Sequence, residues 1–208
     1  MIKLYGTPPT RALRVIWLLN ELGLEYQMLP VDILKGETRE AGFLALNPAG
    51  KVPVLVDGDL VITESCAIQL YLADKYSQAG FIPEAVEDRA KMYRWIFFLA
   101  TEIEQPLWRI ARHTFLYPKE KQLPEDVDLA RQECLEMLAV LEQHMKRRDF
   151  MVADRLSVAD FNAAYTLDWA NEEKMLKDFP ALSAYLTSMY SRPTAPPSTS
   201  GVVRAPAS

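Results

Sequence analysis

The chain is poor in the residues that build metal centres and disulfide networks. It has two cysteines and two histidines among 208 residues, and Cys66, Cys134, His113 and His144 lie far apart in the sequence. A zinc site needs several such ligands at short spacings, so we expect no metal site. The scarcity of cysteine also argues against a disulfide-stapled secreted scaffold and favours a reducing compartment in which both thiols stay free.

Long apolar runs and an excess of basic charge are also missing. No run of about 18 apolar residues appears that would predict a membrane span, and the start MIKLY leads directly into a strand pattern instead of a signal peptide. The net charge is −5, and no basic stripe alternates with aromatic residues. Nucleic acid and membrane are therefore not expected partners. Half of the residues are hydrophobic, which is typical of a globular protein, here expected in the cytoplasm.

The first part of the chain, residues 1–76, alternates strand and helix signals. Asp57-Gly58 between two apolar runs predicts a tight hairpin, and Thr63 is a candidate N-cap for the helix that follows. The expected order is β-α-β-α-β-β-α, with strands at 2–5 and 26–30, helices at 12–22 and 38–46, the hairpin, and a helix over 64–76. This pattern predicts a small α/β domain.

The rest of the chain is helical in pattern. Residues 77–86 contain Gly80 and Pro83 without periodicity and predict a linker, and residues 87–208 predict an all-helical domain. Pro106 predicts a kink in the first long helix. Ser157 and Asp160 have the spacing of a capping box, so we assign them to folding. The tail from 193 to 208 is of low complexity and is expected to be loosely held.

Three stretches of this chain are similar to the cytosolic glutathione transferases: KLYGTPPTRALRV, FLALNPAGKVPVLVDGDLVITESCAI and LSVADF. Their order resembles that of a bacterial member near the beta, delta and phi classes. The resemblance implies a thioredoxin-like glutathione-binding domain at 1–76, a linker at 77–86, and an all-helical substrate-binding domain at 87–208. It also implies a homodimer, with glutathione as co-substrate and a hydrophobic electrophile as second substrate.

Thr10 is the residue that the resemblance assigns to catalysis. In similar segments of the family, the position four before the arginine that corresponds to Arg14 carries the catalytic serine or cysteine, and here it is threonine. A free thiol has a pKa of about 8.5, and lowering it by two units requires about 2.7 kcal/mol of thiolate stabilisation. A hydroxyl donor at a helix N-terminus can supply this. Two alternatives stay open: Thr10 is only an N-cap, or Tyr5, which we expect to lie mostly in the core, is the donor.

A peptide-binding frame follows from the next two motifs. The resemblance implies a cis bond at Val52-Pro53, which leaves the backbone of Val52 free to pair with glutathione as a short added strand. It also implies that Glu64 and Ser65, at a helix N-terminus, bind the γ-glutamyl end, because the helix dipole and the Ser65 groups favour a carboxylate there. The alternatives are a plain loop proline and a helix with an acidic first turn.

Cations and a second-domain carboxylate complete the candidate set. Arg39 and Lys51 are the two candidates for binding the glycine carboxylate, although each alone is also consistent with an ordinary surface charge. Thr101-Glu102 resembles a beta-class stretch that reaches the γ-glutamyl group across a dimer interface, and a solvated helix face is the alternative. Arg109, at helical spacing from Glu102, is a weak candidate for favouring an anionic second substrate.

The expected function is therefore that of a glutathione transferase. The thiolate would attack an electrophilic carbon or reduce a hydroperoxide, and the protein would form no covalent bond itself. The alternative is a non-catalytic transferase-like binding or regulatory module, which the threonine at position 10 favours. A disulfide reductase would need a cysteine at the first helix, and a maleylacetoacetate-type isomerase would need a serine- and cysteine-rich turn; neither is present.

Overall fold

The computed structural model describes residues 1–201 of the chain. These residues form two compact units, one of Met1–Ile82 with Thr194–Pro196 and the other of Pro83–Pro193 with residues 197–201. The segment 77–86, predicted as a linker, contains a short 3-10 turn (η2, Ser77–Ala79) and the junction between the two units.

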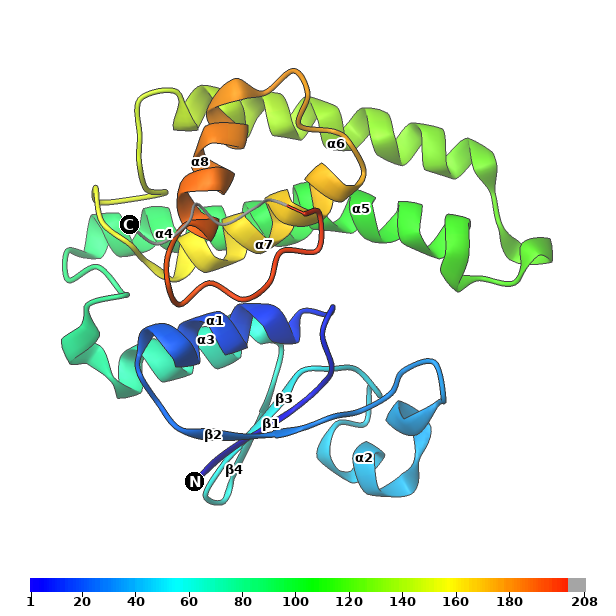
Figure 1. Ribbon diagram of the computed structural model, residues 1–208, viewed down its shortest axis with the longest axis vertical. Coiled ribbons are helices and arrows are strands. Elements are labelled where there is room, and N and C mark those ends of the chain that lie inside the picture. The colour runs from blue at the N-terminus through cyan, green and yellow to red at the C-terminus, as the bar shows by residue number, and fades with distance from the viewer. Residues whose placement is uncertain (202–208) are drawn as a thin grey trace. The chain divides into compact units, whose positions relative to one another are not determined.

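The first unit is a four-stranded sheet with helices on both sides. The sheet order is β2-β1-β3-β4, with β1 and β2 parallel and the other pairs antiparallel. Helices α1 and α3 lie side by side on one face, and α2 lies on the other side of the sheet (Figure 1). The elements are β1 (Ile2–Tyr5), α1 (Ala12–Glu21), β2 (Tyr26–Leu29), η1 (Glu37–Arg39), α2 (Ala41–Leu46), β3 (Val54–Asp57), β4 (Leu60–Thr63) and α3 (Ser65–Lys75). This is the predicted thioredoxin-like order.

Alternation along the central strands divides the core of this unit in two. Leu4 and Leu55 are partners across β1 and β3, and both are fully buried. The next pair, Tyr5 and Val54, points to the opposite face because successive strand residues alternate. There Val54 packs in a second cluster with Val31 and Phe43.

The β3–β4 hairpin forms where the sequence predicts it. Asp57 pairs with Leu60, so Gly58 and Asp59 form a two-residue loop. Gly58 has φ +62, which costs glycine little and most other residues more. The turn chemistry thus sets the register of both strands.

The second unit is all-helical, as predicted. Its elements are α4 (Val86–Phe98), η3 (Leu99–Ile103), α5 (Glu104–Ala111), η4 (Arg112–Leu116), η5 (Lys119–Lys121), α6 (Pro124–Met145), α7 (Val158–Glu172) and α8 (Pro180–Tyr190). Helix α7 is buried on most of its surface and forms the centre of this unit. No helix within residues 1–201 is both long enough and apolar enough to cross a bilayer.

The long helix is interrupted close to Pro106, where a kink is predicted. A π-helical turn, η3 (Leu99–Ile103), directly precedes α5, which begins at Glu104. Pro106 lies in the first turn of α5, where a backbone N–H has no acceptor within that helix. The interruption therefore precedes the proline.

The predicted capping box on α7 is confirmed. Asp160 accepts hydrogen bonds at 2.8 Å from both the backbone N–H and the hydroxyl of Ser157. The same carboxylate accepts 2.8 Å bonds from the Met151 N–H and the Tyr185 hydroxyl. These contacts fix the start of α7 to the preceding loop and to α8.

The prediction of a loosely held tail is wrong for residues 198–200. The carboxylate of Asp168, itself 1% exposed, accepts bonds from the Ser198 hydroxyl at 2.6 Å and the Thr199 N–H at 2.8 Å. The Ser200 N–H and the Tyr190 hydroxyl also donate to it, at 3.3 and 3.1 Å. These residues are therefore anchored on α7. Residues 202–208 of the predicted tail lie outside the described residues.

Candidate functional site

Gly6 marks the place where three segments of the first unit meet. It follows β1 with φ +152, a conformation that side chains rarely adopt. A Cβ atom at Gly6 would lie 3.0 Å from the Cβ of Ala12 and 3.5 Å from the Cβ of Val52. The loop after β1, the first turn of α1 and the segment before β3 therefore approach one another closely. Thr10 and Val52 belong to this neighbourhood.

The loop between β1 and α1 is held from both sides. The Thr7 hydroxyl donates to the carbonyl of Val31 at 3.0 Å and accepts from its N–H at 3.0 Å. The Pro8-Pro9 bond is cis, which the sequence did not predict. These contacts position Thr10 at the entrance of α1.

Thr10 lies one residue before Arg11, the N-cap of α1, so the alternative that Thr10 is itself the N-cap is wrong. Its side-chain oxygen accepts the Ala12 N–H at 3.3 Å, and its carbonyl accepts the Leu13 N–H at 2.9 Å. The side chain is half-buried, and among residues 1–201 its hydroxyl proton has no acceptor. An oxygen that already accepts an N–H is a stronger O–H donor, because linked hydrogen bonds polarise one another. The Thr10 hydroxyl can therefore accept the Ala12 N–H and donate its proton to a ligand atom at the same time.

The cis bond expected at Val52-Pro53 is confirmed. Strand β3 begins two residues later, where Val54 pairs with Tyr5. Within the described part of the chain, neither the N–H nor the carbonyl of Val52 has a protein partner. An extended peptide can pair with these two groups as a short antiparallel strand.

Helix α3 begins one residue later than predicted. It starts at Ser65, and its N-cap is Glu64, so the predicted cap at Thr63 is wrong. Its first backbone bond runs from the Ile68 N–H to the Glu64 carbonyl, at 2.9 Å. The Ser65 and Ala67 N–H groups precede that bond and have no acceptor within the helix. They lie at the positive end of an eleven-residue helix, which favours a bound carboxylate.

The backbone of Glu64 is held in a rarely populated conformation. Its φ and ψ are 66° and 110°, a region that costs a non-glycine residue about 1–3 kcal/mol. Such outliers cluster at ligand-binding sites. The conformation leaves the Glu64 side chain exposed directly before the Ser65 hydroxyl.

Arg14 is the site residue whose role sequence reasoning missed. It is 2% exposed, and its guanidinium donates to the Ser65 hydroxyl oxygen at 3.2 Å. Its carbonyl accepts the Gln69 side-chain amide at 2.9 Å, so α1 and α3 are joined at two points. A charged residue within an otherwise apolar helix was the available signal, but nothing local identifies a partner 51 residues away.

Arg39 and Lys51 approach the same loop. The Asn47 side chain donates to the Lys51 carbonyl at 2.7 Å and accepts the Ala49 N–H at 3.1 Å. The Arg39 guanidinium lies 3.4 Å from the Ala49 carbonyl oxygen. A Cβ atom at Gly50 would lie 2.7 Å from a nitrogen of the same guanidinium. Both cations are exposed beside the segment that leads to Val52, so either or both can reach a carboxylate there.

The expectation that Tyr5 belongs mostly to the core is confirmed. It is half-buried and packs against the cluster of Val31, Phe43 and Val54 on the α2 side of the sheet. This position separates it from the Leu4 face that α1 and α3 cover.

Glu102 and Arg109 belong to the second unit. Glu102 is exposed on η3, and its carboxylate accepts the Thr101 hydroxyl at 2.9 Å. The idea that Arg109 attracts an anionic substrate is wrong, because its guanidinium already pairs with Asp126 and Glu133. Asp126 is the largest cause of the raised pKa of Arg109. The charge of Arg109 is therefore neutralised by carboxylates of its own unit.

Comparisons with known proteins agree with this architecture. Residues 1–74 match the model of the glutathione S-transferase N-terminal domain, and residues 100–193 match that of the C-terminal domain. The chain is 31% identical to glutathione S-transferase F9 of Arabidopsis thaliana over 202 residues, covering 93% of this chain and 94% of that protein. It is 34% identical to glutathione S-transferase 3 of Zea mays over 168 residues, covering 78% and 75% of the two chains.

Solved structures give the same result. The glutathione transferase URE2P8 from Phanerochaete chrysosporium, crystallised with oxidized glutathione, superposes with a TM-score of 0.84 at 28% identity, covering 93% of this chain and 91% of that one. Glutathione transferase F7 from Populus trichocarpa gives a TM-score of 0.83 at 25% identity, covering 93% and 95%. By its sequence, its domains and its fold, the chain belongs to the glutathione S-transferase family.

Proposed function

We propose that the protein is a glutathione transferase that binds glutathione on its first unit and delivers the thiolate to an electrophile. The observation that carries the proposal is the unpaired backbone of Val52 in the same unit as the open first turn of α3. The Val52 backbone presents an N–H and a carbonyl that can pair with an extended peptide. The first turn of α3 presents N–H groups that can bind a carboxylate. A tripeptide with a γ-glutamyl carboxylate requires both.

Each part of glutathione has a proposed partner. Val52 pairs with the backbone of the cysteine residue, and Ser65 with the α3 N-terminus binds the γ-glutamyl carboxylate. The carboxylate of Glu64 forms an ion pair with the ammonium group of the γ-glutamyl residue. Arg39 and Lys51 bind the glycine carboxylate, and Thr10 donates its hydroxyl proton to the sulfur. Because this donor favours the thiolate over the thiol, the pKa of the bound thiol falls.

The chemistry is nucleophilic attack by the sulfur of glutathione. The thiolate displaces a leaving group or adds to an electrophilic carbon, forming a carbon–sulfur bond. With a hydroperoxide, two glutathione molecules reduce the peroxide to alcohol and water and leave as the disulfide. Thr10 stabilises the negative charge on sulfur in either reaction and forms no covalent bond itself.

Finer assignments are part of the same proposal. The first unit is the glutathione domain, and the second binds a hydrophobic electrophile. The F designation of the Arabidopsis relatives supports placement near the phi class. A bacterial origin is part of the same proposal, and one similar solved structure, 29% identical, is a possible glutathione S-transferase from Rhodopseudomonas palustris. We further propose a cytoplasmic homodimer, in which Glu102 reaches the γ-glutamyl group of the partner's glutathione.

The proposal is tested by binding and turnover measured together. We expect the protein to be retained on immobilised glutathione, to be eluted by free glutathione, and to conjugate chlorodinitrobenzene. Ser65→Ala should weaken retention, whereas Thr10→Ala should keep retention and lose most of the conjugation rate. Failure of the folded wild-type protein to bind the column would contradict the proposal.

The second candidate is a glutathione-binding module without catalysis. It is favoured by one observation, namely that the Thr10 hydroxyl oxygen already accepts the N–H of Ala12, the first residue of α1. The same experiment separates the two: a module would be retained on the column but would conjugate no faster than free glutathione, and Thr10→Ala would change neither result.

A further inference from the structure

A groove on the α2 side of the first unit has no part in the proposed glutathione site. It has a volume of about 360 Å³ and is open on one side. One wall comes from the ends of β1 and β2, and the other from η1 and α2. Its lining residues, among them Tyr5, Val31, Glu40 and Phe43, include none of the residues proposed to bind glutathione.

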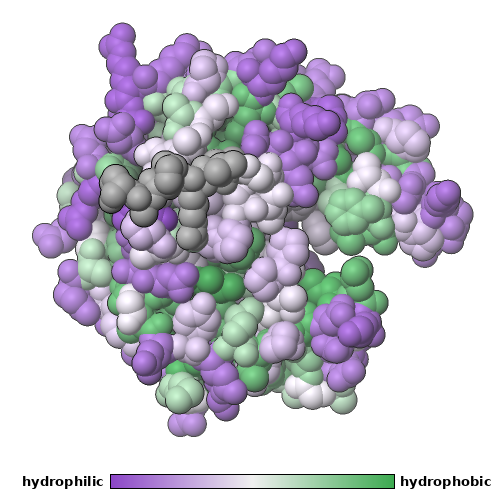
Figure 2. Space-filling model, in the orientation of Figure 1, coloured by the Kyte–Doolittle hydropathy of each residue, from purple (hydrophilic) through white to green (hydrophobic). Residues whose placement is uncertain are grey.

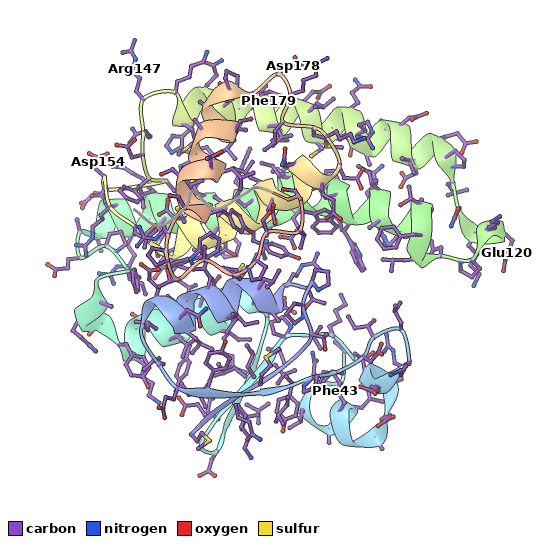
Figure 3. All side chains as sticks on the ribbon, in the orientation of Figure 1. Phe43, Glu120, Arg147, Asp154, Asp178 and Phe179 are labelled. Carbon is purple, nitrogen blue, oxygen red and sulfur yellow. The ribbon has the colours of Figure 1, made fainter. Side chains whose placement is uncertain are left out.

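The floor of the groove is apolar and aromatic. Val31 and Phe43 are buried at 6% and 7% exposure, and Tyr5 and Leu46 pack against them. Phe43, on α2, belongs to the same buried cluster as Val54 of β3 (Figure 3). Among residues 1–201 the Tyr5 hydroxyl has no hydrogen-bond partner. A flat organic molecule can lie against this apolar floor and contact the half-buried Tyr5 ring, whose face also attracts cations.

The polar groups that line the groove are acidic. Glu37 is held in place because its carboxylate accepts the Asp32 N–H at 2.6 Å. Glu40 is exposed and has no ion pair within the described part of the chain. The nearby cation Lys35 is engaged by Asp32 at 3.3 Å, and no lysine or arginine lines the groove. Hydrophobic and strongly hydrophilic residues accordingly lie next to each other over α2 (Figure 2).

From this combination we infer that the groove is a second small-molecule site, specific for flat aromatic organic cations such as protonated amino-substituted nitrogen heterocycles. The volume is within the range of about 300–1,000 Å³ that small ligands occupy. The aromatic floor takes the ring system, and the carboxylates of Glu37 and Glu40 pair with the cationic group. The same carboxylates repel organic anions, so the site discriminates by charge.

Gly42 allows the groove to be filled without disturbing the fold. It lines the groove from α2, and a Cβ atom added to it would meet nothing within 4 Å. Leucine also forms helix more readily than glycine. Gly42→Leu should therefore fold and occupy the space that a ligand would need. Ala45→Leu, at an exposed position of α2 that does not line the groove, is the matched control.

Glu40 permits a separate test of the charge. Its side chain makes no cap bond at the start of α2, so Glu40→Gln should leave the helix intact. Glu25→Gln removes the same charge from an exposed position away from the groove and serves as the control.

The experiment titrates the full chain with the fluorescent cation aminoacridine, and in parallel with the anion anilinonaphthalene sulfonate. We expect saturable binding of one aminoacridine per chain that glutathione does not displace. Gly42→Leu should weaken aminoacridine binding by about tenfold, and Glu40→Gln should weaken it by about fivefold. The two control variants should bind aminoacridine as the wild type does, and no variant should change the binding of the anion. Absence of saturable binding, displacement in step with glutathione occupancy, or equal affinity in all variants would overturn the inference. Retention of Gly42→Leu on immobilised glutathione reports separately on the proposed function.

Discussion

At the scale of single residues, Thr10 stands where the family resemblance implies a serine or a cysteine, and its methyl group distinguishes it from serine. The β-branch restricts χ1, and the bond from the Ala12 N–H at 3.3 Å further restricts the hydroxyl. A hydroxyl fixed in this way donates in one direction only. The hydroxyl can therefore stabilise a thiolate only if the sulfur lies in that direction.

Substitution of Thr10 separates its hydroxyl from its methyl group. Thr10→Ser keeps the donor and should conserve kcat/KM for conjugation within about threefold, because only packing changes. Thr10→Ala removes the donor, and we expect kcat/KM to fall by about 10²-fold, the usual effect of deleting a hydrogen bond to developing or full negative charge. Steady-state kinetics with saturating chlorodinitrobenzene measure both. Equal losses in the two variants would show that the hydroxyl is not the active group.

Ser65 provides a prediction about binding alone. Ser65→Ala removes the hydroxyl that Arg14 orients at 3.2 Å, and a hydrogen bond to a charged ligand contributes about 1.5–3 kcal/mol. We therefore expect KM for glutathione to rise by about 10- to 100-fold with kcat changed little. The exposed Ser77→Ala in η2 is the control. A fall in kcat with unchanged KM would contradict the binding role.

At the scale of elements, local signals predict some contacts and distant partners decide others. Asp57-Gly58 and the Ser157–Asp160 pair are short-range patterns, and both formed as predicted. The anchoring of residues 198–200 was not predictable, because its acceptor, Asp168, lies 30 residues earlier on α7. The cap of α3 was misplaced for a similar reason, since the unusual backbone of Glu64 has no signature in its side chain.

The anchor at Asp168 should stabilise the second unit. Asp168→Asn removes one acceptor oxygen and leaves partly buried donors such as the Thr199 N–H without a good partner. We expect the free energy of unfolding to fall by about 2 kcal/mol, with faster amide exchange at Thr199 and Ser200. Urea denaturation and hydrogen exchange measure the two effects. The exposed Asp178→Asn (Figure 3) should change neither, and unchanged exchange in Asp168→Asn would refute the anchor.

The pairing of α5 with α6 predicts a dependence on acid. Arg109 donates to Asp126 at 3.2 Å and is the largest cause that lowers the pKa of Asp126 below its usual 3.8. Because the folded state binds this proton less tightly than the unfolded chain, the stabilisation is present above that usual value. It is lost as the pH falls through the lowered pKa.

Arg109→Gln tests this pairing. We expect the free energy of unfolding to fall by about 1 kcal/mol near neutral pH. Its further fall between about pH 5 and pH 2 should be smaller than in the wild type. Chemical denaturation across this pH range provides the measurement. Parallel pH profiles of the two proteins would mean that the pair contributes no acid sensitivity.

At the scale of the whole molecule, the order of elements was accessible from sequence and the assembly of the site was only partly so. The hydrophobic periodicity and the turn residues specified the sheet and the helical half. They could not specify that the Arg14 guanidinium donates a hydrogen bond to the Ser65 hydroxyl. Nor could they specify that Ala12 and Val52 pack closely against Gly6, or that a π-helical turn precedes Pro106. These features depend on which distant segments come into contact on folding, and short-range sequence patterns do not predict those contacts.

The central claim is that Thr10 lowers the pKa of the thiol of bound glutathione. The most direct measurement is the ultraviolet thiolate absorbance of glutathione bound to the wild type and to Thr10→Ala, followed across pH. We expect the thiol in the wild type to titrate about two units below the free value of about 8.5, and the thiol in Thr10→Ala to return most of the way toward it. The same titration midpoint in both proteins, or a wild-type midpoint at the free value, would contradict the account.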